Sequence, residues 1–374
     1  MAEQRAYYQD EWSRFWVSAA GFWRGFPALR AWSLVALLVG TVVAQLYVQF
    51  RLNYWNRDFF DALERRDSTQ LRLAALLLIP LLGSSILLSV SSVWGRMTLQ
   101  RCWRDWLTRH VIDYWAEDRR YARLVQAPGE HQIPEYRIAE DVRIATDAPV
   151  DLALGLISSL LTAVVFVQVL WQVGGDLSFT ALGRHFWVPG YLVISVAVYS
   201  GIVTSAMLLV GARLSRVIKQ KDQREAELIT AAHLLRDIGE GTAHQAQEAD
   251  VKQGLRDALG RTINQWRHLC WQLMRTTFVS SGNTLLAPIV GLVLCAPKFL
   301  AGIITLGELT QAAAAFTLVQ GSFNWLVDNF MRLADWKSSA ERVGTLLLSL
   351  DGLDHAGSAK NSTEAPEASL TSLP

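Results

Sequence analysis

The sequence predicts an all-α membrane protein with six transmembrane helices, some of which continue as long cytoplasmic helical extensions. The first observation is compositional: 51% of the 374 residues are hydrophobic and only 18% are charged, whereas soluble domains carry about 25% charged residues. The second is that the apolar residues form runs of about 20, the length that a helix needs to cross a bilayer. The third is that long charged segments with helical periodicity adjoin several of these runs.

Six apolar runs are long enough to be spans. They cover residues 31–50, 71–94, 152–171, 191–211, 277–297 and about 306–331. The last run is the most polar, since it contains Glu308, Gln320, Asn324 and Asp328. We expect this span to face other helices or a water-filled cavity, because polar side chains are costly in lipid.

Basic residues between the runs predict the orientation. Residues 95–149 contain nine Arg and residues 212–276 contain eleven Lys and Arg, whereas residues 172–190 and 298–305 contain one basic residue each. Basic loops tend to stay on the cytoplasmic side, so we expect both long segments and both chain ends there. The connection 51–70 then lies outside despite its Arg residues, whose charge is partly offset by acidic neighbours.

The N-terminal 30 residues are interpreted as a tail followed by an interfacial elbow helix. One face of that helix would carry Trp12, Phe15, Trp16, Ala19 and Trp23. Such an aromatic face is typical of a helix lying at headgroup level. A cleaved signal peptide is not expected, because the apolar run starts late and no small-residue cleavage site follows it.

The remaining chain is expected to divide into two parts. Residues 31–343 form the six-span transmembrane domain, and residues 344–374 are polar and rich in small residues, which predicts a disordered cytoplasmic tail. No G-x-x-x-x-G-K-[ST] motif occurs in the printed sequence. We therefore expect no ATPase domain and no ATP hydrolysis by this chain alone.

The stretch "LNYWNRDFFDALERRD" (residues 52–67) follows the first span without a break. On a helix it would be amphipathic, with an apolar face packed on a neighbour and the pairs Arg57–Asp61 and Asp61–Arg65 on the other face. Asp67, three residues before Gln70, resembles a capping box that starts the second span. Either this is an ordinary packed hairpin, or it forms the outer rim of a substrate cavity.

Several functional classes are disfavoured. The net charge of +1 lacks the basic surplus of a nucleic-acid binder. The three cysteines are scattered and form no CxxC, so neither a zinc site nor a disulfide framework is indicated. HExxH and GxSxG motifs are absent, which predicts no catalytic residues, no metal and no cofactor.

Four stretches carry a resemblance to a known family. They are "LNYWNRDFFDALERRD", "YRIAEDV" (136–142), "QREAE" with "LLRDIGE" (223–227 and 234–240), and "FLAGIITLGELTQAAAAFTLVQGSFNWLVDNFMRLADWKSSAERV" (299–343). These residues resemble the SbmA/BacA-type peptide transporters and the transmembrane domains of related ATPase-fused ABC half-transporters. One departure is Ile133-Pro134-Glu135-Tyr136, where many relatives have Asn-Pro-Asp-Gln, and it puts normal docking of an ATPase in doubt.

The resemblance implies an ABC-exporter-like transmembrane fold and a homodimer in a bacterial inner membrane. It also implies import of peptides or other bulky hydrophilic solutes, such as antimicrobial peptides, glycopeptide antibiotics or cobalamin. Two energy sources stay open. One is the proton gradient, as in members without an ATPase, and the other is a separately encoded ATPase that would make this chain a permease half.

Two sets of candidate site residues follow from this reading. Proton coupling needs carboxylates that alternate between wet and buried states, and the candidates are Glu140, Asp141, Glu225, Asp237, Glu240 and Asp328. For these residues, capping, ATPase contact or an ordinary ion pair (Asp328 with Arg332, for example) is the alternative. The substrate path would be lined by Trp55, Phe59, Asp61, Gln320, Asn324, Trp325 and Asn329.

Two rival classes remain. A multispanning membrane enzyme would need a His/Asp or Ser/His cluster near one interface, and the sequence shows none. A scaffold subunit without transport of its own would be favoured if the polar face of the sixth span packed against neighbouring helices instead of facing a cavity.

Overall fold

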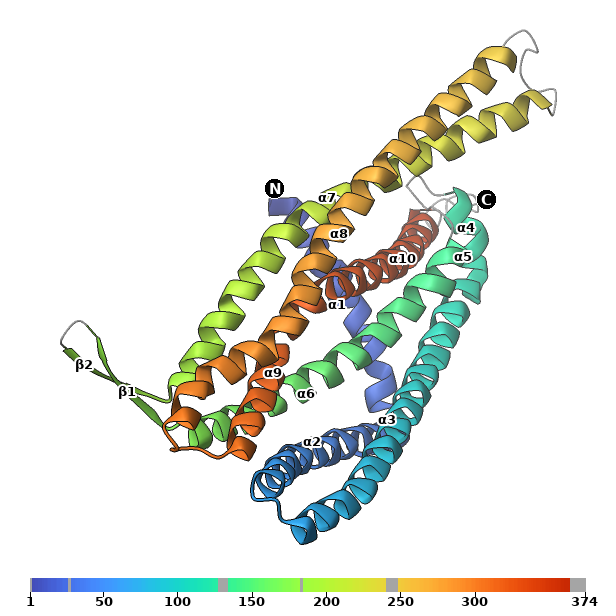
Figure 1. The fold of residues 1–374 in the computed structure, drawn as a ribbon. Helices are drawn as coiled ribbons and strands as arrows, with labels where there is room; N and C mark the ends of the chain where they lie inside the picture. Colours follow the sequence, from blue (N-terminus) through green and yellow to red (C-terminus); the bar gives the residue numbers. More distant parts are fainter. Residues whose placement is uncertain (1, 26–27, 127–133, 182–183, 240–247, 364–374) are drawn as a thin grey trace, which may run out of the picture. The chain divides into compact units, whose positions relative to one another are not determined.

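The computed structural model describes residues 2–25, 28–126, 134–181, 184–239 and 248–363. Almost all of these residues are helical, which confirms the all-α class (Figure 1). The long helices are α1 (Ala2–Arg24), α2 (Ala28–Glu64), α3 (Ser68–Ala116), α6 (Val142–Gly174), α7 (Tyr191–Gly239), α8 (Glu248–Leu300), α9 (Leu306–Asp328) and α10 (Phe330–Thr363). The short elements are η1 (Glu117–Arg119), α4 (Arg120–Gln126), α5 (Pro134–Tyr136), the π-helix η2 (Arg137–Asp141) and the strands β1 (Asp176–Ala181) and β2 (Arg184–Pro189).

Five helical stretches among the described residues are long and apolar enough to cross a membrane. They are Ala28–Glu64, Ser68–Leu124, Pro134–Gly174, Tyr191–Gly239 and Ala249–Leu300. The chain is therefore a multi-pass membrane protein. The sixth expected span corresponds to α9, whose polar residues keep it outside this set, so the number six stays a prediction.

The helices divide into two compact units. Unit 1 contains residues 1–52, 72–161 and 328–374, and unit 2 contains residues 53–71 and 162–327. The chain crosses from one unit to the other inside α2, α3, α6 and, at its last residue, α9. Long continuous helices therefore contribute one part of their length to each unit.

The core of unit 1 is formed by α1, α3 and α10. Phe15, Ala19 and Phe22 of α1 are almost completely buried, and they belong to one cluster with Leu107 of α3 and Leu347 of α10. The predicted apolar face of the N-terminal helix thus exists, but a large part of it is covered by protein rather than by lipid headgroups. The reason is that neighbouring helices offer it apolar surface at the same spacing.

The end of unit 1 corrects one expectation. Residues from Gly344 onward are not a disordered tail, because α10 continues to Thr363. Leu346, Leu347 and Leu350 are buried, since this spacing places them on one helical face. Gly344 lies directly against the backbone of α1, where a Cβ atom would collide with a carbonyl oxygen. Residues 364–374 lie outside the described residues.

A half-buried ion pair at the edge of this core connects α1, α3 and α10. Arg14 donates from Nε to Oδ2 of Asp351 at 2.6 Å and from Nη2 to Oδ1 at 3.1 Å. The hydroxyl of Tyr114 donates to the same carboxylate, and the guanidinium of Arg120 lies 4.1 Å from the Tyr114 ring centroid. Burial raises the pKa of Asp351, but the hydrogen bonds from Arg14 and Tyr114 outweigh it and hold the pKa below its ordinary value.

In unit 2, α7 and α8 run side by side as a long antiparallel pair (Figure 1). Side-chain amides and hydroxyls of α8 bind carbonyl oxygens of α7 at three levels. Gln272 donates to Val210 O at 2.6 Å, Gln265 to Val217 O at 3.3 Å, and Thr262 to Arg224 O at 3.2 Å. The carbonyls recur every seven residues, as expected for two helices that stay in register.

The strands β1 and β2 form an antiparallel hairpin between α6 and α7, paired from Asp176↔Pro189 to Ala181↔Arg184. This hairpin was not expected from the sequence. At its base, Lys298 from the end of α8 donates to the carbonyl of Gly174 at the end of α6. The connections 172–190 and 298–305, predicted to share one side of the membrane, therefore lie at the same end of unit 2.

Gly344→Ala should destabilise the protein, because the added Cβ atom meets the Glu11 carbonyl oxygen of α1. Overpacking of this kind costs about 1–3 kcal/mol, and the melting temperature of the detergent-solubilised protein measures it. Gly352→Ala on the same helix is the matched control. Gly352 has no heavy atom within 4 Å of an added Cβ, so this variant should melt at the same temperature or slightly higher. Equal losses in both variants would contradict the close packing of α1 on α10.

Asp351→Asn should lower the melting temperature at neutral pH, since it removes the charge that Arg14 and Tyr114 bind. The pKa of Asp351 is lowered in the folded state. The carboxylate therefore stabilises the protein fully above the unfolded pKa of about 4, and this stabilisation is lost as the pH falls through the folded pKa. Melting curves from neutral to acid pH should show the gap between wild type and variant closing. A gap that stays constant in acid would refute this role, and Asp105→Asn, whose partner Arg109 is exposed, should show little effect at any pH.

Candidate functional site

The extended end of α2 holds the first turn of α9 within unit 2. A helix N-terminus exposes backbone N–H groups without intrahelical partners. Here the N–H of Leu306 donates to Oε2 of Glu64 at 3.0 Å, and the N–H of Gly307 donates to Oδ1 of Asp61 at 2.9 Å. Both carboxylates come from α2, and their negative charge also complements the positive end of the α9 dipole.

A capping box completes this helix start. The N–H of Glu308 donates to Thr305 Oγ1 at 3.1 Å, and the N–H of Thr305 donates to Glu308 Oε2 at 3.2 Å. Gly307 permits the close approach, because a Cβ atom there would collide with the Arg57 carbonyl oxygen and the Asp61 carboxylate. The start of α9 is thus specified both locally and by α2.

We name this contact the α2–α9 seam and define it by Asn53, Arg57, Asp61 and Glu64 on α2 and residues 306–311 on α9. Arg57 Nη2 lies 3.4 Å from Glu308 Oε1, and its Nε lies 3.8 Å from Asp61 Oδ2. One turn further in, Asn53 donates from Nδ2 to the carbonyl of Gln311 at 3.2 Å. The contacts therefore recur along three turns of α2.

The seam agrees with the expectation for the stretch after the first span and adds a partner for its charged face. The predicted helix is present, and its Arg57–Asp61 pair is confirmed. The charged face binds the start of α9, because carboxylates match the free N–H groups of a helix start. The expected cap is also confirmed, since Asp67 Oδ1 accepts from the N–H groups of Thr69 and Gln70 at 2.9 and 3.1 Å.

Several buried polar atoms of the seam lack a hydrogen-bond partner among the described residues. They are Oδ1 of Asn53, Nε of Arg57, and both Oε1 and Nε2 of Gln311. Gln311 is only 1% exposed and Asn53 only 4%. An unsatisfied buried polar group costs about 1–3 kcal/mol. Separation of α2 from α9 would hydrate these atoms, so the closed seam is less stable than an apolar contact of the same size.

The predicted polar face of α9 is buried within unit 2. Gln320 and Asn324 are 3% and 6% exposed, and the hydroxyl of Thr204 on α7 donates to Asn324 Oδ1 at 3.4 Å. Nearby, Tyr199 donates from its hydroxyl to Asn283 Oδ1 on α8 at 3.1 Å. In this conformation the face packs on neighbouring helices, the arrangement that we associated with a scaffold subunit.

The remaining residues that we expected to line the substrate path lie on α2 and near the end of α9. Trp55 and Phe59 stack on each other along α2, with centroids 5.1 Å apart. Asp328 is the last residue of α9, and the half-buried Trp325 and Asn329 lie on either side of it in the sequence. The suggested pair of Asp328 with Arg332 does not form, because Arg332 Nη2 lies 2.7 Å from Asp151 Oδ2 instead.

Two of the proton-coupling candidates lie in the π-helix η2 of unit 1. Asp141 is 1% exposed and is bound by Arg342 of α10 through Nε at 2.9 Å and through Nη2 at 2.5 Å. Its neighbour Glu140 accepts from Arg143 at 2.5 Å, and this bond lowers the pKa of Glu140. A π-turn is frequent at functional sites. Here it orients the two neighbouring carboxylates so that each binds a different Arg.

The other cytoplasmic candidates lie on α7 in unit 2. Glu225 pairs with Lys221 at 2.8 Å and accepts from the Trp266 indole of α8 at 3.2 Å. The Lys221 bond is the main reason that the pKa of Glu225 is lowered. Asp237 is half-buried near the far end of α7, and Glu240 lies outside the described residues. The predicted carboxylates are thus spread over both units.

Comparison with known proteins identifies the chain's relatives. Residues 27–300 match the family model described as ABC transporter transmembrane region 2. The chain is 29% identical over 316 residues to the inner membrane ABC transporter ATP-binding protein YddA of Escherichia coli K12, which covers 83% of this chain and 56% of that protein. It is 20% identical over 333 residues to ABC transporter D family member 2, chloroplastic, of Arabidopsis thaliana, covering 89% and 45%. The chain spans about half the length of the curated relatives it matches.

Asp61→Ala should loosen the first turn of α9, because the Gly307 N–H loses its acceptor. Loss of a cap costs about 1 kcal/mol, which corresponds to roughly fivefold faster exchange of the amides at the α9 start. Hydrogen–deuterium exchange of a peptide covering residues 303–312 measures this. Asp58→Ala removes an exposed carboxylate one turn away on the same helix and should leave the exchange unchanged. Equal effects of both variants would mean that general charge, rather than the cap, stabilises α9.

Proposed function

Because the chain belongs to the family of ABC transporter transmembrane region 2 domains, we propose that it forms the membrane pathway of a solute importer. Two copies would enclose one cavity in a bacterial inner membrane, with all four chain ends in the cytoplasm. The observation that carries this proposal is the family match over residues 27–300 together with the five apolar helices. Both observations agree with a membrane transporter domain.

The proposed substrates are peptides or other bulky hydrophilic solutes, including antimicrobial peptides, glycopeptide antibiotics and cobalamin-like molecules. This class rests on the motif resemblance of the sequence. A wide cavity would hold such varied solutes by few contacts, for which the Trp55–Phe59 stack and the residues Trp325 and Asn329 are candidates. These side chains are half-buried, so a partner copy or a solute can reach part of their surface.

We place the outward gate at the α2–α9 seam. In the closed state, Asp61 and Glu64 hold the start of α9, and each such charge-assisted bond contributes about 1.5–3 kcal/mol. The unsatisfied amides of Asn53 and Gln311 oppose closure because they gain hydrogen bonds in water. The two opposing contributions are of similar size, a few kcal/mol each, so differential binding of a solute can shift the equilibrium between the closed and the open seam.

The proton gradient is the proposed energy source, and Asp141 is the leading carboxylate. Its ion pair with Arg342 joins η2 to α10 in unit 1. Protonation of Asp141 would remove the counter-charge that Arg342 binds, so the contact between η2 and α10 would weaken, and the half-exposed Arg342 could turn toward water. Proton uptake would therefore be linked to a movement of α10 relative to η2.

A permease half served by a separate ATPase is the alternative. The printed names of several relatives include the words ATP-binding protein, and the chain matches about half of their length. Those relatives therefore contain sequence beyond the part that this chain matches. An ATPase on another chain, or in a longer form of this one, would then drive the same membrane pathway.

The proposal is tested by uptake of a fluorescent proline-rich peptide into proteoliposomes that contain only this chain. A pH gradient of either direction is imposed without ATP. We expect uptake that follows the gradient and is lost in Asp141→Asn. The double variant Asp141→Asn/Arg342→Gln removes both charges and keeps the site neutral, so it should fold and still fail to couple. Asp257→Asn, an exposed carboxylate on α8, should transport normally.

Three outcomes would each contradict a different part of the proposal. Gradient-driven uptake that is unchanged in both Asp141 variants would exclude Asp141 as the coupling residue. No uptake with any gradient, followed by uptake when a co-purifying ATPase and ATP are added, would establish the permease half instead. No uptake under either condition, although the chain is folded and inserted, would favour a scaffold role.

A further inference from the structure

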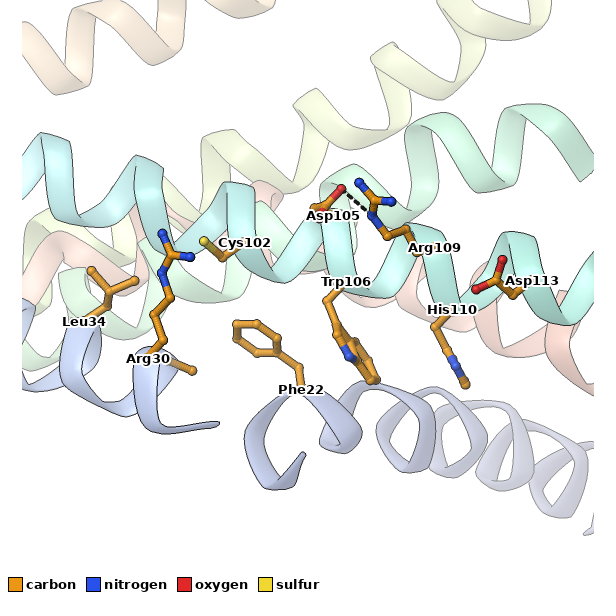
Figure 2. A pocket seen from close by; sticks show the side chains of 10 residues that line it. Phe22, Arg30, Leu34, Cys102, Asp105, Trp106, Arg109, His110 and Asp113 are labelled. Carbon is orange, nitrogen blue, oxygen red and sulfur yellow. Dashed lines mark hydrogen bonds and ion pairs between the residues drawn. The ribbon is translucent and has the colours of Figure 1, made fainter. Parts of the chain in front are cut away.

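A cavity of about 380 Å³ lies in unit 1 where α1, α2 and α3 meet (Figure 2). Its floor is apolar and buried, formed by Phe22 of α1 and by Ala31 and Leu34 of α2. Its other wall is the face of α3 from Cys102 to Asp113. The cavity is separate from the α2–α9 seam, which belongs to unit 2.

The cavity opens at the level where α2 enters the membrane. Arg30 immediately precedes the apolar run of residues 31–50, so its side chain lies at headgroup level whichever way the protein is inserted. The flanking Leu29 and Trp32 are 85% and 57% exposed. Exposed apolar and aromatic side chains beside an Arg are characteristic of the membrane interface. We therefore expect phospholipid headgroups beside the Arg30 end of this cavity.

Hydrogen-bond donors without acceptors line the cavity. Within the ranges that the structure describes, the Arg30 guanidinium has no ion-pair or hydrogen-bond partner, and the N–H groups of Trp106 and His110 reach no acceptor. The Trp106 and His110 rings stack with centroids 5.3 Å apart and planes 11° apart. Gly21 of α1 leaves room for the Trp106 ring, since a Cβ atom there would lie 2.6 Å from it. These contacts hold both rings in place.

The charged side chains that line the cavity are distributed unevenly along it. Arg109 donates from Nε to Asp105 Oδ1 at 2.9 Å, so these two compensate each other. The side chain of Arg30 extends toward Cys102, whereas Asp113 lies at the opposite end beyond His110 (Figure 2). Cys102 and Asp113 are about 16 Å apart along the α3 axis at 1.5 Å per residue. The end of the cavity nearest the membrane is therefore cationic.

We propose that this cavity binds the phosphodiester headgroup of a membrane phospholipid. Arg30 supplies the planar, charged donor that matches phosphate oxygens, and the N–H group of Trp106, one turn of α3 beyond Cys102, supplies a further donor. The acyl chains would continue along the apolar run of α2. Basic pockets between helices at the membrane surface bind phospholipid headgroups in this manner. The bound lipid would fasten the junction of α1 and α2 to the bilayer.

Native mass spectrometry of the full chain in detergent tests the proposal, with phosphatidylglycerol as the probe. Arg30→Ala should weaken binding of the first lipid roughly tenfold. Arg101→Ala is the matched control, because Arg101 is an exposed Arg on α3 that does not line the cavity. It should bind as the wild type does. Trp106→Phe keeps an aromatic ring at this position and removes one donor, so it should cause a smaller loss.

Two further binding measurements identify which part of the lipid is recognised. Diacylglycerol, which lacks the phosphate, should bind at least tenfold more weakly than phosphatidylglycerol, and free glycerol phosphate should not compete at equal concentration. Equal losses for Arg30→Ala and Arg101→Ala, equal binding of diacylglycerol, or effective competition by glycerol phosphate would each overturn the proposal. If Arg30→Ala does not fold, Arg30→Lys retains the charge without the planar fork. It should still bind more weakly than the wild type, and unchanged binding would contradict the role of Arg30.

Discussion

The start of α9 depends on two carboxylates that the chain supplies more than 240 residues earlier. Asp61 and Glu64 accept hydrogen bonds from the free N–H groups of Leu306 and Gly307, and they can do so only because Gly307 has no side chain. This interaction explains why the first membrane-crossing helix continues beyond its apolar run. The charged extension of α2 is the cap of the last helix of unit 2, and it fixes the position at which that helix begins.

Polar contacts between helices recur elsewhere in the protein. In unit 2, the amides and hydroxyl of α8 that bind α7 carbonyls fix which turns of the two helices meet, along a part of the pair that we expect at and beyond the cytoplasmic membrane surface. In unit 1, the Arg14–Asp351 pair and the close approach of α1 at Gly344 join the two ends of the chain into one core.

The same polar contacts give the protein elements that can change partners. The α2–α9 seam combines strong cap bonds with unsatisfied amides, and the η2–α10 pair sets a buried carboxylate against Arg342. An apolar core of equal size would have one stable arrangement. The amides of the seam can instead bind water, and the carboxylate of the η2–α10 pair can instead bind a proton. An alternating-access transporter needs such bistable contacts, and our proposals assign one of them to each unit.

The sequence by itself determined the helical class, the membrane-crossing runs and the caps. These features follow from local rules, such as apolar run length and the Asp67 cap, that need no knowledge of the fold. It also identified the family, because the motifs are continuous in the chain. The path of residues 344–363 was decided by the tertiary structure, since the leucines of α10 are buried only where α1 and α3 provide a surface. The partners of Asp61, Asp141 and Arg332 were likewise decided there, because each binds a residue that is distant in the sequence, and periodicity cannot reveal which of several charged neighbours lies within reach.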